Sequence, residues 1–199
     1  STTTYVDIDR ADHVLLVGFE PEEESPIVFL RINKQVRKRA LKVTAIATKL
    51  SIGVEKLKGE FVKVAPGAEA SAIASQSLSA KSVILVGERA AESAGVLSAV
   101  AALADSTGAK IAWIPRRAGE RGALEAGAIG NLLPGGRPVT DASARVDIAA
   151  VWGVDSLPSA EGKSAQEIYA AAHTGEIGAL LVGGVDPLDG DNSQGALAA

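Results

Sequence analysis

Val83-Ile84-Leu85-Val86-Gly87 is an apolar run that opens the part of the sequence on which the fold prediction depends. An alanine-rich amphipathic segment follows it and ends at Gly108, and a second apolar run, Ile111-Ala112-Trp113-Ile114, comes next. Apolar runs that do not alternate with polar residues, joined by a helix, are typical of parallel strands buried on both faces. The stretch therefore predicts a strand, a helix that ends at Gly108 and a second, parallel strand.

A long loop rich in arginine and glycine leaves the second strand, from Pro115 to Pro138. Open α/β sheets bind ligands beyond the carboxyl ends of their strands, glycine lets a backbone approach a ligand closely, and arginine pairs with phosphate or carboxylate. One interpretation is an anion-binding loop, and the other is a subunit-contact loop whose arginines pair with Glu120 and Glu125. The candidate residues for binding a polyanion are Gly18, Arg116, Arg117 and Arg121.

The sequence before residue 83 predicts the same alternation of strand and helix. Val14 to Gly18 is another apolar run, and Ser25-Pro26 is typical of an N-cap followed by proline in the first helical turn. We expect a helix from Pro26 to about Arg39 and a strand from Lys42 to Ala47, joined to the first strand by a right-handed crossover. Weaker signals predict a short strand at Phe61–Val64 and an alanine-rich helix that ends near Leu78.

The last third of the chain repeats this theme more loosely. We expect a strand at Ile148–Val151, a helix opened by the capping-box pattern Ser164-Ala165-Gln166-Glu167, a final buried strand at Ala179–Gly183 and a polar tail that frays after Asp186. A weak internal repeat links the two ends of the sequence. Leu15-Leu16-Val17-Gly18 and Leu180-Leu181-Val182-Gly183 are each followed by an acidic residue and proline.

These elements predict an α/β fold with a doubly wound, mostly parallel, Rossmann-like sheet of five or six strands and helices on both faces. We expect residues 1–12 to be a lead-in, residues 13–187 to form the α/β domain and residues 188–199 to be a flexible tail. A division of the domain into halves at 13–80 and 81–187 stays open as an alternative.

The composition excludes several classes of site. The 199 residues contain no cysteine, so this chain cannot form disulfides, thiolate zinc sites or cysteine-ligated iron–sulfur clusters. The net charge of −4 argues against general nucleic-acid binding, and no apolar run is long enough to cross a membrane. The sequence begins with serine and contains no methionine, so we expect it to be an excised or processed piece.

The short motifs of nucleotide and metal sites are incomplete here. No two glycines stand two positions apart, which rules out the Gly-x-Gly-x-x-Gly dinucleotide fingerprint. Gly162-Lys163-Ser164 matches the end of a phosphate-binding loop, but Leu157 occupies the position of its first glycine. His13 and His173, the two histidines, show no metal-ligand spacing, and we expect them at the surface or at a helix end. We therefore predict no metal site and no catalytic residue.

The segment Ala11 to Pro21, with Pro26 and the basic helix after it, resembles the first strand of the molybdopterin oxidoreductase family. The arginine- and glycine-rich blocks Pro115–Gly127 and Asn131–Pro138 resemble, within it, the G subunits of bacterial NADH-quinone oxidoreductase, respiratory complex I. The resemblance spans roughly Ala11 to Pro187, and the long block is its most specific part.

This resemblance implies a place in a large peripheral-arm subunit. The N-terminal part of such a subunit holds iron–sulfur clusters that pass electrons from NADH toward quinone, and its C-terminal part is a molybdopterin-enzyme fold generally without a molybdenum cofactor. It therefore implies a cofactor-free structural and interaction segment that is not catalytic alone. Its expected partners are other peripheral-arm subunits, on the cytoplasmic side of the inner membrane, with no nucleic acid and no membrane span of its own.

One departure from the family bears on the cofactor. The family usually has asparagine before the proline at the strand ends, where the pterin dinucleotide binds, whereas this sequence has Glu20 and Asp186. A carboxylate about 4 Å from a phosphate is repelled by roughly 4 kcal/mol at an effective dielectric constant near 20. We therefore expect a degenerate pterin site. The alternative is a free-standing Rossmann-like domain that binds a nucleotide or another polyanion.

Overall fold

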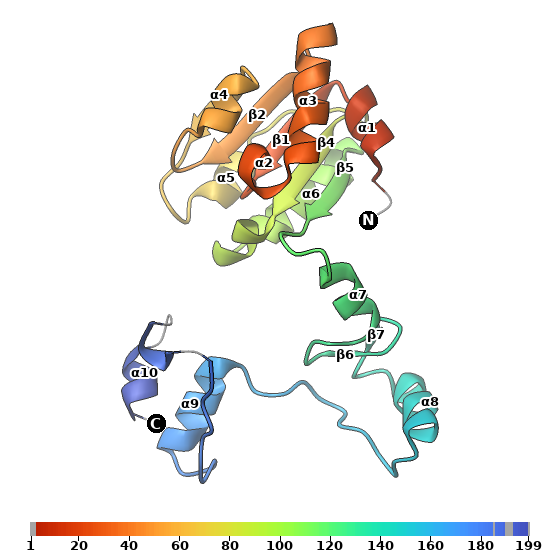
Figure 1. Ribbon diagram of the computed structural model, residues 1–199, viewed down its shortest axis with the longest axis vertical. Coiled ribbons are helices and arrows are strands. Elements are labelled where there is room, and N and C mark those ends of the chain that lie inside the picture. Colours follow the sequence, from red (N-terminus) through yellow and green to blue (C-terminus); the bar gives the residue numbers. More distant parts are fainter. Residues whose placement is uncertain (1–2, 185, 190–192, 199) are drawn as a thin grey trace. The chain divides into compact units, whose positions relative to one another are not determined.

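The structure is a computed structural model that describes residues 3–184, 186–189 and 193–198. The chain divides into two compact units, Ser1–Ala118 and Gly119–Ala199, which are labelled by element in Figure 1. The lead-in, domain and tail boundaries expected from the sequence stay predictions.

A parallel sheet of five strands forms the first unit, in the order β3-β2-β1-β4-β5. β1 is central, pairs with β2 on one side and β4 on the other, and is buried at all five of its positions. This arrangement confirms the doubly wound α/β fold and the strands expected between Val14 and Ile114. The strands are β1 (His13–Val17), β2 (Lys42–Ala47), β3 (Glu60–Lys63), β4 (Val83–Gly87) and β5 (Lys110–Ile114).

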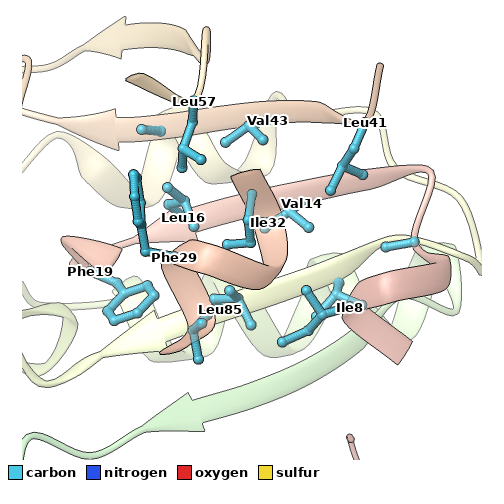
Figure 2. Packing of buried hydrophobic residues seen from close by; sticks show 14 of the residues in the cluster. Ile8, Val14, Leu16, Phe19, Phe29, Ile32, Leu41, Val43, Leu57 and Leu85 are labelled. Atoms are coloured by element: carbon cyan, nitrogen blue, oxygen red, sulfur yellow. The ribbon is translucent and has the colours of Figure 1, made fainter. Parts of the chain in front are cut away.

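Helices cover both faces of the sheet, and each face has its own hydrophobic core. On one face, Phe29 and Ile32 of α3 lie against Leu16 of β1 and Leu85 of β4 (Figure 2). On the other face, residues of α5 and α6 pack against Leu15 and other strand residues. The helices of this unit are α1 (Tyr5–Arg10), α2 (Pro21–Glu24), α3 (Pro26–Arg39), α4 (Ile52–Lys56), α5 (Glu69–Ala74), the 3₁₀ helix η1 (Glu88–Glu92) and α6 (Val96–Thr107).

The helix α3 begins and ends where the sequence predicts. Pro26 occupies its first turn, and three basic residues complement the helix dipole in its last turn. Arg39 donates hydrogen bonds to the carbonyl oxygens of Asp9 and Ala11, which satisfies the carboxyl end of α1. The helix α1 itself was not predicted, because six residues with a polar start were interpreted as a lead-in.

The second unit contains helices and one short hairpin. Its core is small and is formed by Leu133, Val139, Ala144 and Ile148. The predicted capping box at Ser164 and Glu167 is confirmed at the start of α9. The elements are α7 (Glu120–Glu125), β6 (Leu132–Leu133), β7 (Arg137–Pro138), α8 (Ala142–Trp152), α9 (Ala165–His173), the 3₁₀ helix η2 (Pro187–Asp189) and α10 (Ser193–Ala198).

Two strand predictions in the second unit are wrong. Ile148–Val151 belongs to α8, where Ala144 and Ile148 are buried four residues apart and Asp141 caps the first turn. Ala179–Gly183 lies in an irregular segment, and no strand of the described residues pairs with it. The tail expected to fray includes η2 and α10, although residues 190–192 and 199 lie outside the described part of the chain.

His13 is buried, so the prediction of a surface or helix-end position is wrong for this residue. It is the first residue of β1, and its Nε2 lies 2.8 Å from Oγ1 of Thr44 on β2. Burial lowers the pKa of His13, and the charge of Lys42 lowers it further, against smaller opposing effects of Asp12 and Glu60. His173 does lie at a helix end, the last residue of α9.

We expect the buried His13 to make the first unit less stable in mild acid. The unfolded chain takes up a proton at the ordinary histidine pKa of 6.5, whereas the folded chain has a lower His13 pKa and resists that proton. Stability should therefore fall as the pH drops below about 6.5, until the folded pKa is passed. Urea unfolding of the wild type and a His13→Gln variant between about pH 7 and pH 5 checks this. Equal pH dependence of the two proteins would contradict it.

Candidate functional site

A cleft of about 510 Å³ lies at the carboxyl edge of the sheet, where β1, β2 and β4 end. From β1, the strand order continues to β2 and β3 on one side and to β4 and β5 on the other. The carboxyl edge beside β1 is therefore the topological switch point of the sheet. Ligands of open α/β sheets bind at such points. The polar and charged side chains that line the cleft are those of Glu20, Thr48, Lys49, Ser51, Glu69, Arg89, Glu92 and Ser93.

Gly18 lines this cleft, as its place after β1 predicts, but close backbone packing accounts for its identity. Its φ is +55°, and a Cβ atom there would clash with the backbone of Ala90 in η1. A Cβ atom on Gly87, at the end of β4, would clash with the carbonyl oxygen of Gly18. The two glycines therefore bring the exits of β1 and β4 together, which leaves no backbone cradle for a ligand between them.

Glu20 places its carboxylate inside the site. It accepts hydrogen bonds from the hydroxyl of Ser51, after β2, and from the backbone N–H of Glu22, 3.2 Å away. Ser51 in turn caps α4 by accepting a hydrogen bond from the N–H of Val54. A Cβ atom on Gly53 would overlap the Glu20 carboxylate, so the glycine leaves room for that group. The acid thus links the exit of β1 to the start of α4.

Two of the other acids after β1, Glu22 and Glu24, are also paired within the fold. Glu22 forms an ion pair of 2.5 Å with Lys56 of α4, and the buried side chain of Glu24 forms an ion pair with Arg89 of η1. Arg89 lines the cleft, but its positive charge is neutralised by its ion pair with Glu24. The carboxylates of Glu20, Glu22 and Glu24 therefore link the exit of β1 to α4 and η1.

The remaining charges do not create a site for a pyrophosphate. Glu69 has a buried carboxylate oxygen for which the described residues provide no hydrogen-bond donor, and Lys49 is exposed at the rim. Phosphate sites of this fold offer backbone N–H groups and cations, whereas this cleft offers carboxylate oxygens from Glu20 and Glu69. The residues present do not fit the phosphates of a pterin dinucleotide. They favour a hydrogen-bond donor or a cation.

Two of the three arginines predicted to bind a polyanion, Arg117 and Arg121, are paired with acids. Arg117 forms an ion pair of 3.3 Å with Glu88, which also accepts a hydrogen bond from the backbone N–H of Arg116. Arg121 pairs with Glu125 one turn along α7, at 2.9 Å. Neither Arg116 nor Arg117 lines the cleft, and Arg121 belongs to the second unit. The Arg121–Glu125 pair agrees with the interpretation in which the loop arginines pair with acids of the loop.

Three residues of the cleft were not predicted from the sequence: Ser51, Glu69 and Arg89. Ser51 follows β2 and precedes a helix, so the N-cap pattern could have indicated it. No local signal identifies Arg89, whose partner Glu24 is distant in the sequence, or Glu69, which lines the cleft from α5.

The described residues contain neither a membrane-spanning helix nor a metal-binding cluster. No helix in residues 3–184, 186–189 or 193–198 has the length and hydropathy that a membrane crossing needs. Within the same residues, no group of three or more histidine or acidic side chains has the arrangement of a metal site.

The comparisons with known proteins agree with one another. The family model of molybdopterin oxidoreductase matches residues 1–197. The G subunit of NADH-quinone oxidoreductase from Mycobacterium tuberculosis is 49% identical over 204 residues, which cover 98% of this chain and 25% of that protein. The G subunit from Streptomyces coelicolor is 48% identical over 202 residues, which cover 94% and 24%. Formate dehydrogenase H of Escherichia coli is 38% identical over 71 residues, 36% of this chain and 10% of that enzyme. The chain spans about a quarter of the length of the G-subunit relatives that it matches.

Proposed function

Because the chain belongs to the molybdopterin oxidoreductase family, we propose that it is a cofactor-free structural and interaction segment of an NADH-quinone oxidoreductase. The high identity to two G-subunit proteins, over almost the whole chain, supports this assignment. The observation that carries the cofactor-free role is the Glu20 carboxylate, which is bound to Ser51 at the switch point of the sheet.

In this proposal, electrons pass from NADH to quinone through clusters held outside this chain, since the chain has no cysteine. Its partners are other peripheral-arm subunits of the complex, and its place is the cytoplasmic side of the inner membrane. An antibody against this chain tests the assignment on fractionated cells. A native band in a large membrane-associated complex supports it, and a free band of the chain's own size contradicts it.

We expect the wild-type chain to bind a guanine dinucleotide or GDP no tighter than about 1 mM, because Glu20 repels phosphate. A Glu20→Asn variant, which carries the residue usual in the family, should bind GDP roughly tenfold tighter. Titration calorimetry measures both affinities. Glu22→Gln is the matched control, because it removes a neighbouring charge whose partner Lys56 lies outside the cleft lining. Micromolar binding by the wild type would contradict the cofactor-free role.

A nucleotide-binding domain remains the second candidate, and the volume of the cleft and the exposed Lys49 at its rim favour it. That function requires nucleotide binding that weakens with salt, as phosphate contacts do. It also requires weaker binding in a Lys49→Ala variant, or in an Arg121→Ala variant if the loop takes part. Salt-independent binding, or none, would exclude this candidate.

A further inference from the structure

A second hollow, of about 390 Å³, lies at the amino edge of the sheet, at the opposite end of the strands from the cleft described above. It is bordered by the first residues of β4 and β5, and α1 lies beside the start of β5 (Figure 1). The residues that line it are Asp7, Arg10, Ala80, Lys81, Val83 and Lys110. Three cations and one acid give this lining a net charge of +2, in a chain whose net charge is −4.

Two of these cations have no acidic partner. Arg10 and Lys81 are exposed, and among the residues that the structure describes neither side chain has an ion pair or a hydrogen bond. Asp12 is bound by the turn that carries Lys81, but through hydroxyl groups. It accepts hydrogen bonds from Ser79 and Ser82, at 2.5 and 2.9 Å. The positive charges of Arg10 and Lys81 are therefore available to a ligand.

The third cation, Lys110, is paired with the acid of the lining. Its Nζ lies 2.5 Å from Oδ1 of Asp7, which also forms the capping box of α1 with Thr4. The hydrogen bonds from Lys110 and Thr4 hold the pKa of Asp7 well below its ordinary value, so this acid stays ionised. A lysine ammonium group has more than one N–H donor, so Lys110 can bind an anion in the hollow while it keeps Asp7.

The backbone segments that carry the three cations are held in place by hydrogen bonds. In the turn before β4, the N–H of Ser82 donates to the carbonyl oxygen of Ser79 at 2.9 Å, and the N–H of Lys81 donates to the Ser79 hydroxyl at 3.0 Å. The N–H of Lys110 donates to the carbonyl oxygen of Ser82 at 3.0 Å. The carboxyl end of α1, which carries Arg10, is bound by Arg39. Binding therefore has to order side chains only, which lowers its entropic cost.

We propose that this hollow binds the terminal phosphate of a small soluble phosphate ester or diphosphate. A terminal phosphate carries about two negative charges and several acceptor oxygens, which match the net charge of the lining and its three cations. A single carboxylate has only one charge and fewer acceptor positions. The volume of the hollow is in the range of small-molecule sites. The proposal is independent of the proposed function, because the two concern opposite edges of the sheet and share no lining residue.

Titration of the protein with inorganic pyrophosphate, followed by NMR of the backbone amides, tests this proposal. We expect the amides of Lys81, Val83 and Lys110 to shift with a Kd of about 1 mM in about 20 mM salt, and the binding to weaken several-fold in about 150 mM salt. Arg10→Gln and Lys81→Gln should each weaken it at least about threefold, because each removes a charge that the fold does not use. Lys34→Gln is the matched control. This exposed lysine of α3 lies outside the lining, so its loss should leave the Kd within about twofold.

Three results would overturn the proposal. Equal weakening by Lys34→Gln would mean that pyrophosphate is attracted by the general surface charge. Succinate, a dicarboxylate, should bind several-fold more weakly, and equal binding would remove the preference for phosphate. Shifts confined to the other edge of the sheet, at Thr48 and Lys49, would place the anion in the switch-point cleft. That last result would also contradict the cofactor-free role, whereas a lack of shifts at both edges would overturn only the present proposal.

Discussion

A Leu15→Ala variant is expected to lose about 2–5 kcal/mol of the free energy of unfolding of the first unit. Leu15 is fully buried in the middle of β1, between β2 and β4, and belongs to the core that α5 and α6 cover. Truncation removes most of a buried side chain and leaves a cavity that the central strand cannot close, because its backbone is fixed by pairing on both sides.

Urea unfolding monitored by tryptophan fluorescence measures this loss. Trp113 lies in β5 of the first unit and Trp152 ends α8 of the second, so a Trp152→Phe background isolates the signal of the first unit. Leu181→Ala is the matched control, because it makes the same change at a fully exposed leucine of the second unit. The control should change stability by less than about 0.5 kcal/mol. Similar losses in both variants would contradict the burial of Leu15.

Replacing Gly18 with alanine is expected to destabilise the same unit by about 3 kcal/mol or more. Two costs combine at this position. A residue with a Cβ atom is strained at the φ of +55°, and the atom would also clash with the backbone of Ala90. Relief of the clash would push η1 away from β1 and disturb the packing of both strand exits.

A Gly67→Ala variant separates the two costs. Gly67 also has a positive φ, +86°, but a Cβ atom there would meet nothing within 4 Å. It should therefore show the backbone strain alone, roughly 1 kcal/mol. Urea unfolding of the two variants in the Trp152→Phe background compares them. An equal loss in both would mean that the approach of Gly18 to Ala90 adds nothing to stability.

The parts of the fold that local patterns decide were predicted well. The start of α3 follows from a proline in the first turn and its end from the basic residues of the last turn, and β1, β2, β4 and β5 follow from apolar runs. The strand prediction at Ile148–Val151 failed because a four-residue apolar run fits a helix equally well, and the cap at Asp141 decided for the helix. The prediction at Ala179–Gly183 failed for another reason. A strand forms only where a neighbour can pair with it, and a local pattern cannot show whether that neighbour is present.

The site could be predicted only in part. The four glutamates after β1 were evident from the sequence, and Glu20 was expected to disfavour a phosphate. Its partner Ser51 lies 31 residues away, and the Arg89 that pairs with Glu24 lies 65 residues away. Such pairs arise from the order of the strands, which one sequence does not determine. For the arginine loop, composition left open a ligand site or arginines paired with Glu120 and Glu125, and Arg121 pairs with Glu125, one turn along the same helix.

The central position of β1 has a consequence for the nascent chain. Val14 pairs with Val43 on one side and with Val83 on the other. At about 5–20 residues per second, a ribosome needs several seconds after β2 to synthesise and release β4. During that interval one edge of an almost entirely apolar strand has no partner, and open apolar edges are sites of aggregation. Cotranslational folding of this protein therefore includes a period in which a chaperone that binds short apolar segments has a defined target, the sequence His13–Val17.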